Sequence, residues 1–429
     1  MNSIFKGKIL SPISKSKIFF LNLGYLVISE KGKILEISKN NLRNKYKNFL
    51  FFDFFDKILC PGFIDIHNHL PQLPLIGISS STLFTWLNRI VFPYEEKFGY
   101  KEFAQKYSGI FFHKLLKNGT TTTSTYVTIH KEATDIAFKS AKESGIRAFI
   151  GKVMMDREVP ENMLENTQRS LQDSKELIEK WDGYDEGRLR YVLTPRFAVS
   201  CSFPMLKGIG ELAKKYNVYI QSHLAESKSE IELIQKLYPE FENYTEIYYR
   251  AGILSEKTIM AHCIYLDKKE IKTLQNTGTK ISHCPTANRF LSSGIMPYRK
   301  LEETGLTIGL GTDVAGGYSL SMFNEMKEAI ETSKTINFMN PKEQYKPITV
   351  EEAFYLATLG GATALSIENE TGSLEKGKSA DFLVVDYQKL NDFKDNDILS
   401  EVKNILSKMI YCGDERIIEQ VYVRGKRVV

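Results

Sequence analysis

A chain of 429 residues with 42% hydrophobic and 25% charged residues has enough apolar material for a buried core of ordinary size. The net charge of +5 is small, and acidic residues are interspersed among the lysines, which argues against a surface for binding nucleic acid. The five cysteines are odd in number and form no C-x-x-C pair, so we expect free thiols in a reducing cytoplasm.

The N-terminal segment lacks the basic start and the apolar core of a signal peptide. The apolar stretch at residues 18–28 contains Asn22 and Gly24, and it is too short to cross a bilayer. We therefore expect a cytoplasmic protein that binds neither membranes nor nucleic acid.

Short β-like segments make up residues 1–60, with breaks of glycine or of lysine and asparagine between them. Residues 374–429 likewise contain short β-like segments separated by turn residues. Neither end is long enough for a closed core of its own, so we predict that the two ends combine into one small β-sandwich domain. The strand candidates are residues 17–22, 25–29, 33–38, 380–386 and 419–424.

Residues 61–373 alternate between strand-like and helix-like stretches, which is typical of βα units around a parallel sheet. The helix-like stretch at residues 227–237 begins with Ser227 and has Glu230 three positions later, the spacing of a capping box. Eight strands with helices between them predict an α/β fold, a (β/α)8 barrel of the TIM type. The strand candidates are residues 59–67, 121–129, 146–154, 189–197, 218–223, 258–262, 279–283 and 306–312.

Histidines and one aspartate collect at the ends of these strand candidates. The carboxyl ends of barrel strands form one mouth, where side chains from distant parts of the chain meet. A metal site requires such a meeting, because imidazole and carboxylate ligands must lie about 2.0–2.2 Å from one ion. The residues in this position are His67, His69, His223, His262, His283 and Asp313.

Each of these residues has an ordinary structural explanation when it is taken singly. His67 and His69 could be hydrogen-bonded polar side chains, and Asp313 could cap a helix. A shared position at several strand ends is a much rarer coincidence, so the joint pattern favours a metal site. Glu226 lies three residues after His223, where a carboxylate can take a proton from a metal-activated water. A first-turn glutamate stabilised by a helix dipole is the alternative explanation for Glu226.

The segment at residues 61–69, together with His223, His262 and Asp313, resembles the amidohydrolase superfamily, which uses a metal-bearing barrel. Within that superfamily, nearly the whole chain resembles the guanine deaminase family. The segments that carry this second resemblance are HNHLPQ at 67–72, LFTWL at 83–87, FP at 92–93, GTTT at 119–122, RAFIGK at 147–152, TPRF at 194–197, QSHLAE at 221–226 and GLGTDVAGG at 309–317.

The resemblance implies one zinc ion per subunit, held by His67, His69, His223 and Asp313. The same ligands also suit iron or another divalent ion. For His262 it implies either a hydrogen bond to the reacting water or a place as a fifth ligand. It further implies that the subunits form a homodimer.

The implied reaction converts guanine and water into xanthine and ammonia, with Glu226, His262 and Asp313 as catalytic residues. Glu226 would take the proton of the water and pass it to a ring nitrogen, and Asp313 would help to protonate the departing amine.

Recognition of the base falls, by the same resemblance, to Gln72, Arg196 and Phe197. An arginine can donate to the O6 carbonyl that distinguishes guanine from adenine, an amide can bind the base edge, and a phenylalanine ring can cover the base. Each residue also has an ordinary explanation, as a solvated loop side chain, a surface ion pair or a core aromatic residue. The other residues implied to contact the base are His69, His223, Glu226 and Asp313.

Some residues fit the family pattern less well. Leu70 stands where the family often has a smaller residue, and Arg289 adds a charge near the expected mouth. We interpret His283 as a polar support for a loop or as a second hydrogen-bonding histidine, and His113 as a structural residue. His130 has no assigned role.

Two alternatives stay open from the sequence. Another aminohydrolase of the superfamily, acting on methylthioadenosine, S-adenosylhomocysteine, a triazine or a pterin, would keep the histidines but would not need Gln72, Arg196 and Phe197. A binding protein that kept the barrel and lost catalysis would not need Glu226. The complete set of metal-ligand, proton-transfer and base-contacting residues favours a guanine deaminase.

Overall fold

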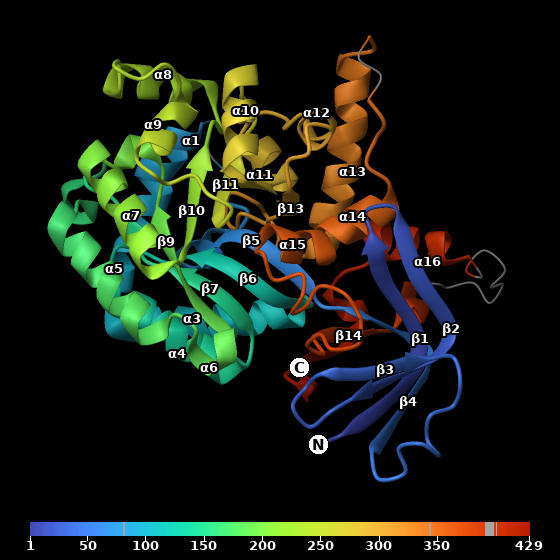
Figure 1. Cartoon of the computed structure of the whole chain (residues 1–429). Helices are drawn as coiled ribbons and strands as arrows, with labels where there is room; N and C mark the ends of the chain where they lie inside the picture. The colour runs from blue at the N-terminus through green and yellow to red at the C-terminus, as the bar shows by residue number, and fades with distance from the viewer. Residues whose placement is uncertain (80–81, 343–344, 391–398, 400) are drawn as a thin grey trace.

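Two β-sheets organise the chain in the computed structural model, which describes residues 1–79, 82–342, 345–390, 399 and 401–429 (Figure 1). One sheet is a parallel barrel surrounded by helices, and the other is a mixed sheet built from both ends of the chain. The predicted combination of a (β/α)8 barrel with a small terminal β domain is confirmed. No helix within these described ranges is long and apolar enough to cross a membrane.

The barrel strands run parallel to one another and follow the order of the chain. The barrel closes through backbone hydrogen bonds from the N–H of Asp313 to the carbonyl of His67 at 2.8 Å and from the N–H of His69 to the carbonyl of Val314 at 3.0 Å. Each of the eight predicted strands overlaps a barrel strand, and the candidate at residues 59–67 also takes in the end of a strand of the other sheet, residues 50–61. The barrel strands are β5 (Phe63–His69), β6 (Thr120–Tyr126), β7 (Arg147–Gly151), β9 (Leu189–Pro195), β10 (Tyr219–Leu224), β11 (Thr258–His262), β12 (Lys280–His283) and β13 (Ile308–Leu310), with the short β8 (Val153–Met154) paired to β9.

Apolar side chains pack together near the N-terminal ends of the barrel strands. Ile64, Phe149, Val192 and Ile259 come from four different strands, and they form one buried cluster with residues of α15 (Leu359–Ala364). A packed barrel interior leaves no open channel, so a ligand must approach from the carboxyl ends of the strands.

Helices lie around the outside of the barrel (Figure 1). The predicted capping box is present at α8 (Lys228–Leu237), where the hydroxyl of Ser227 accepts from the N–H of Glu230 at 3.2 Å and the Glu230 carboxylate accepts from the N–H of Ser227 at 3.3 Å. The other main helices of this layer are α3 (Lys101–Lys117), α4 (Lys131–Ser144), α5 (Thr167–Trp181), α7 (Phe203–Tyr216), α9 (Tyr244–Arg250), α10 (Lys268–Thr277), α11 (Pro285–Phe290), α13 (Met322–Met339) and α14 (Val350–Leu356).

The second sheet has seven strands and joins the two ends of the chain, as predicted. The junction is the antiparallel pairing of β4 (Leu50–Pro61) with β14 (Phe382–Val385). Ile34 from one edge strand and Tyr422 from near the other edge share a buried cluster with Phe5, so the sandwich takes the form of one continuous sheet curled over its own core. The remaining strands are β1 (Ser3–Ser14), β2 (Lys17–Ile28), β3 (Ile34–Ser38), β15 (Ile418–Val423) and β16 (Lys426–Arg427).

A buried ion pair joins this terminal sheet to the barrel. Nη2 of Arg147, the first residue of β7, lies 3.2 Å from Oδ2 of Asp381, which precedes β14. The hydroxyl of Thr371 donates to the same oxygen at 3.0 Å, and the backbone N–H of Arg424 donates to the other oxygen at 2.7 Å. Because Arg147 begins its strand, this contact lies at the end of the barrel opposite to the strand-end histidines.

Candidate active site

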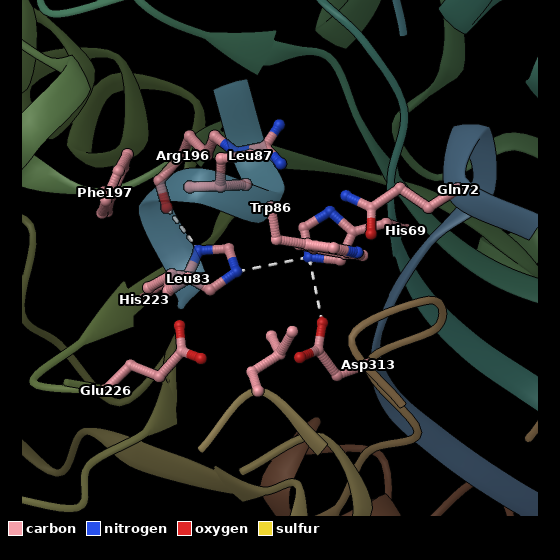
Figure 2. A pocket seen from close by; sticks show the side chains of 11 residues that line it. His69, Gln72, Leu83, Trp86, Leu87, Arg196, Phe197, His223, Glu226 and Asp313 are labelled. Atoms are coloured by element: carbon pink, nitrogen blue, oxygen red, sulfur yellow. Dashed lines mark hydrogen bonds and ion pairs between the residues drawn. The ribbon is translucent and has the colours of Figure 1, made fainter. Parts of the chain in front are cut away.

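Four of the strand-end histidines lie with Asp313 in one buried cluster at the carboxyl ends of the barrel strands, namely His67, His69, His223 and His262. Nε2 of His69 lies 3.3 Å from Nε2 of His223 and 3.2 Å from Oδ1 of Asp313 (Figure 2). Nε2 of His67 also lies 3.2 Å from Oδ1 of Asp313. Side chains from β5, β10 and the segment after β13 therefore meet within hydrogen-bonding distance of one another.

The spacing of these atoms suits a single metal ion. Four ligands about 2.0–2.1 Å from a tetrahedral ion lie about 3.3 Å from one another, and the separations of 3.2 and 3.3 Å are of this size. One donor atom from each of His67, His223, His262 and Asp313 lies within 4.8 Å of the others. In the described part of the chain, the buried Nε2 atoms of His67 and His262 make no hydrogen bond, which is costly unless an ion or a water satisfies them.

Burial favours the neutral form of three of the histidines. It holds the pKa of His67, His69 and His223 well below the ordinary value, and a neutral imidazole offers a lone pair to a metal. Nδ1 of His223 lies 2.5 Å from the carbonyl oxygen of Arg196. Because a carbonyl can only accept, Nδ1 carries the hydrogen and the lone pair of His223 is on Nε2, which faces the cluster.

His262 has a different environment. Its Nε2 lies 3.6 Å from Oε2 of Glu226 and 3.8 Å from Oδ2 of Asp313, and its Nδ1 lies 2.8 Å from Oδ1 of Asn288. Burial opposes the charged ring, but the negative charges of the nearby carboxylates and the hydrogen bond to Asn288 together outweigh it and raise the pKa of His262. His262 thus lies between two carboxylates, at longer distances than those that join the other donor atoms.

The backbone is strained where it leaves three of the barrel strands. Ala225, His262 and Asp313 have φ angles of +52°, +71° and +46°. Positive φ is rare for residues other than glycine and costs of order 1–3 kcal/mol. Such strain persists only where the surrounding structure fixes it, and it gathers at functional sites. All three positions lie at the mouth of this cluster, next to Glu226 or in the cluster itself.

Glu226 is a buried carboxylate beside His262. Its Oε1 accepts from the hydroxyl of Ser293 at 2.8 Å, and its backbone N–H donates to Oε2 of Glu230 at 2.8 Å. Burial raises the pKa of Glu226, which makes the carboxylate a better proton acceptor near neutral pH. A carboxylate of this kind, next to a group of candidate metal ligands, can take up a proton and return it.

A cavity lies beside the cluster (Figure 2), and its empty space, counted together with the open solvent at its mouth, is about 350 Å³. Its apolar lining comes from Leu83, Trp86, Leu87, Phe197 and Leu291, and large apolar and aromatic side chains suit a flat ring. The polar lining residues are His69, Gln72, Arg196, His223, Glu226 and Asp313.

A carboxylate with no assigned role in the sequence joins two of these polar residues. Glu95, the last residue of α2 (Phe92–Glu95), is fully buried. Its Oε1 accepts from Nε2 of Gln72 at 3.0 Å and from Nη1 of Arg196 at 3.1 Å, and its Oε2 accepts from Nη1 of Arg196 at 2.8 Å. The nearest sequence signal was the Phe-Pro pair at residues 92–93, which does not by itself indicate a site.

Four other residues considered from the sequence are not among the described residues that line the cavity. His283 is buried, and burial lowers its pKa to about 3. Arg289 pairs with Glu328 at the surface, so its charge is compensated. His113 is exposed on α3, and His130 directly precedes α4.

Residues 58–428 match the amidohydrolase family. The guanine deaminase of Dictyostelium discoideum is 36% identical over 441 residues, which cover 99% of this chain and 98% of that protein. A crystal structure of guanine deaminase from C. acetobutylicum with guanine bound in its active site is similar with a TM-score of 0.94 at 35% identity, covering 100% of both chains. The E. coli guanine deaminase structure is similar with a TM-score of 0.93 at 32% identity, covering 100% of this chain and 99% of that one. The chain belongs to the amidohydrolase family.

Proposed function

We propose that this protein is a guanine deaminase, a hydrolase that converts guanine and water into xanthine and ammonia. The observation that carries the proposal is one cavity whose lining brings together candidate metal ligands, the Glu226 carboxylate, and the side chains of Gln72 and Arg196. Glu95 lies behind that lining and accepts hydrogen bonds from both Gln72 and Arg196. The relatives named above support the proposal. They are guanine deaminases, their similarity to this chain covers nearly the whole length of both proteins, and one of them holds guanine in its active site.

The metal in this proposal is zinc, held by His67, His69, His223 and Asp313. Imidazole nitrogens with one carboxylate are common zinc ligands, although the same set also suits iron. When bound, zinc lowers the pKa of a water molecule to about 7 and so supplies a nucleophile at neutral pH. The longer distances from His262 to the carboxylates of Glu226 and Asp313 support a hydrogen-bonding role for His262 toward the reacting water.

Glu226 would carry a proton between the water and the base. Its carboxylate takes the proton that the water loses as the water oxygen bonds to C2 of guanine, and then delivers it to a ring nitrogen. Asp313 helps to move the second proton of the water to the departing amine, which leaves as ammonia. One C–O bond forms and one C–N bond breaks, so the step is a hydrolysis with no change of oxidation state.

Arg196, Gln72 and Phe197 would recognise the base. Arg196 donates to O6 of guanine, whereas adenine carries an amine at that position and cannot accept in the same way. Gln72 binds the base edge, and Phe197 covers part of the ring. A site built on such hydrogen bonds rejects bases that lack the partner atoms far better than an apolar slot does. The lining residues at the reacting end are His69, His223, Glu226 and Asp313.

We also propose that the protein acts in the cytoplasm as a homodimer. All five cysteines are free and four of them are buried, which suits a reducing compartment. The homodimer is supported by the resemblance to guanine deaminases alone, and light scattering on the purified protein tests it directly.

Replacing Glu226 by glutamine tests the reaction. Glutamine keeps the shape of the side chain but cannot take the proton, so Glu226→Gln should lower guanine turnover by about 10²- to 10⁴-fold while bound metal stays stoichiometric. Glu270→Gln is a matched control, because Glu270 is also a buried carboxylate but caps α10 and does not line the cavity.

The two outcomes that count against the proposal are distinct. Turnover by Glu226→Gln close to that of the wild type would exclude the proton-transfer role of Glu226. Failure of the metal-loaded wild type to form xanthine from guanine would exclude the proposed function itself.

A further inference from the structure

We propose that Glu95 is the positioning residue that sets specificity for guanine, because it fixes the direction of both side chains that recognise the base. This assignment rests on the proposed function and extends it to a residue that does not itself line the cavity. Glu95 is 23 positions from Gln72 and 101 positions from Arg196 in the chain, and its carboxylate is nevertheless the common acceptor for both.

Glu95 decides which end of the Gln72 amide faces the base. A carboxylate can only accept, so the NH2 group of Gln72 points to Oε1 of Glu95 at 3.0 Å. The backbone N–H of Ala315 can only donate, and it donates to Oε1 of Gln72 at 3.1 Å. The two neighbours therefore exclude the flipped amide, and the second hydrogen of the NH2 group has a fixed direction.

Glu95 also holds the guanidinium group of Arg196. Both carboxylate oxygens accept from Nη1, at 3.1 and 2.8 Å. The guanidinium carbon lies 5.1 Å from the centre of the Phe92 ring, which belongs to the same short helix α2. Among the described residues, Nε and Nη2 of Arg196 have no hydrogen-bond partner, and Arg196 lines the cavity, so these donors remain for a ligand oxygen.

The charge of Glu95 matters as much as its direction. Arg196 is only 3% exposed, and a buried charge without a partner is strongly unfavourable. Glu95 compensates it with a carboxylate that is 0% exposed, so this wall of the cavity carries no net charge. A neutral wall with directed donors suits a neutral base that presents a carbonyl oxygen.

The test compares two ligands that differ at position 6. Guanine has a carbonyl oxygen there, whereas 2-aminopurine has the same 2-amine and no oxygen. In Glu95→Gln, Arg196 loses its fixed direction, so we expect kcat/KM for guanine to fall about 10- to 100-fold, mainly through KM. Inhibition by 2-aminopurine should change by less than about threefold, because that base does not use the contact with Arg196 and the amide oxygen introduced by Glu95→Gln can still accept from Gln72. A merely structural defect would weaken both ligands equally.

Asp381→Asn is the matched control for loss of a buried carboxylate that pairs with arginine. Asp381 pairs with Arg147 at the opposite end of the barrel, so its loss should lower the melting temperature and leave the KM for guanine unchanged. Bound metal is measured in every variant and should stay stoichiometric.

Glu95→Asp keeps the inference testable if the glutamine variant does not fold. Aspartate retains the charge with a shorter reach, so the loss of kcat/KM for guanine should be smaller than in Glu95→Gln but still larger than the change for 2-aminopurine. Equal losses for the two ligands, or kinetics of both variants within about twofold of the wild type, would overturn the role of Glu95. A wild type that does not deaminate guanine would instead overturn the proposed function and this inference with it.

Discussion

Nδ1 of His223 lies 2.5 Å from the carbonyl oxygen of Arg196, so the backbone of Arg196 contacts a proposed metal ligand and its side chain lines the proposed base cavity. A substitution changes the side chain and leaves the carbonyl in place. Metal binding and base recognition should therefore separate at this residue.

Arg196→Lys should weaken guanine recognition while the metal stays bound. Lysine keeps a positive charge beside Glu95 but lacks the planar fork of donors that an arginine offers. We expect kcat/KM for guanine to fall about 10- to 100-fold, with stoichiometric metal in the same sample. Steady-state kinetics and metal analysis check this. Loss of metal together with activity would show that the side chain also supports the ligand geometry.

Ser293→Ala should slow the chemical step. The hydroxyl of Ser293 donates to Oε1 of Glu226 at 2.8 Å and so restricts the direction of the carboxylate that we propose carries the proton. A hydrogen bond to a charged group contributes about 1.5–3 kcal/mol, so kcat should fall by roughly tenfold or more while KM stays nearly unchanged. Ser293→Thr keeps the hydroxyl and is the control. An alanine variant with wild-type kcat would show that the contact does not position Glu226.

His69→Asn and His262→Asn should differ in metal content. Nε2 of His69 lies 3.2–3.3 Å from two other proposed ligand atoms, whereas Nε2 of His262 lies 3.6 Å or more from the nearest carboxylates. We expect His69→Asn to lose metal on dialysis, and His262→Asn to keep metal and lose turnover. Equal loss of metal by both variants would identify His262 as a fifth ligand.

The ion pair between Arg147 and Asp381 should make stability depend on pH. Burial alone would raise the pKa of Asp381, but the charge of Arg147 and several hydrogen bonds hold it below the ordinary value. The unfolded chain therefore binds the proton more readily. The stabilisation is complete above the unfolded pKa of about 3.9 and is lost as pH falls through the folded pKa.

Asp381→Asn should remove this contribution. It would also leave the buried Arg147 without the charge of its buried partner, so that only the partly exposed Glu370 still pairs with it. The free energy of unfolding at pH 7 should fall by roughly 3–5 kcal/mol, the usual cost of removing one member of a buried pair. Urea denaturation at pH 7 and below pH 4 measures both effects. A variant whose denaturation midpoint equals that of the wild type at pH 7 would show that the pair contributes nothing.

The sequence predicted the barrel strands and the strand-end cluster because both depend on local patterns. Apolar runs such as residues 258–262 end in a histidine, and the barrel rule places all such ends at one mouth. The first strand was not predicted, because Gly7 and Pro12 interrupt its pattern and its pairing with β2 and β4 forms it instead. The break expected between residues 22 and 25 is also absent, since Gly24 lies within β2.

Glu95 shows what the sequence does not contain. Its role comes from contacts with Gln72 and Arg196, which are distant in the chain and meet only in the folded protein. A single glutamate in a short helix is normally a solvated side chain, and no local pattern separates that case from a buried anchor. Burial and hydrogen-bond partners, which only the structure provides, separate them.

The deamination of guanine is tested most directly by a panel of bases with metal-loaded protein. Guanine, adenine and a triamino-triazine are each incubated with protein of known metal content, and ammonia release is measured together with the product base. We predict xanthine and ammonia in equal amounts from guanine, and a kcat/KM for adenine lower by about 10⁴-fold or more. Preferred turnover of adenine or of the triazine, or no xanthine from guanine at full metal content, would contradict the assignment.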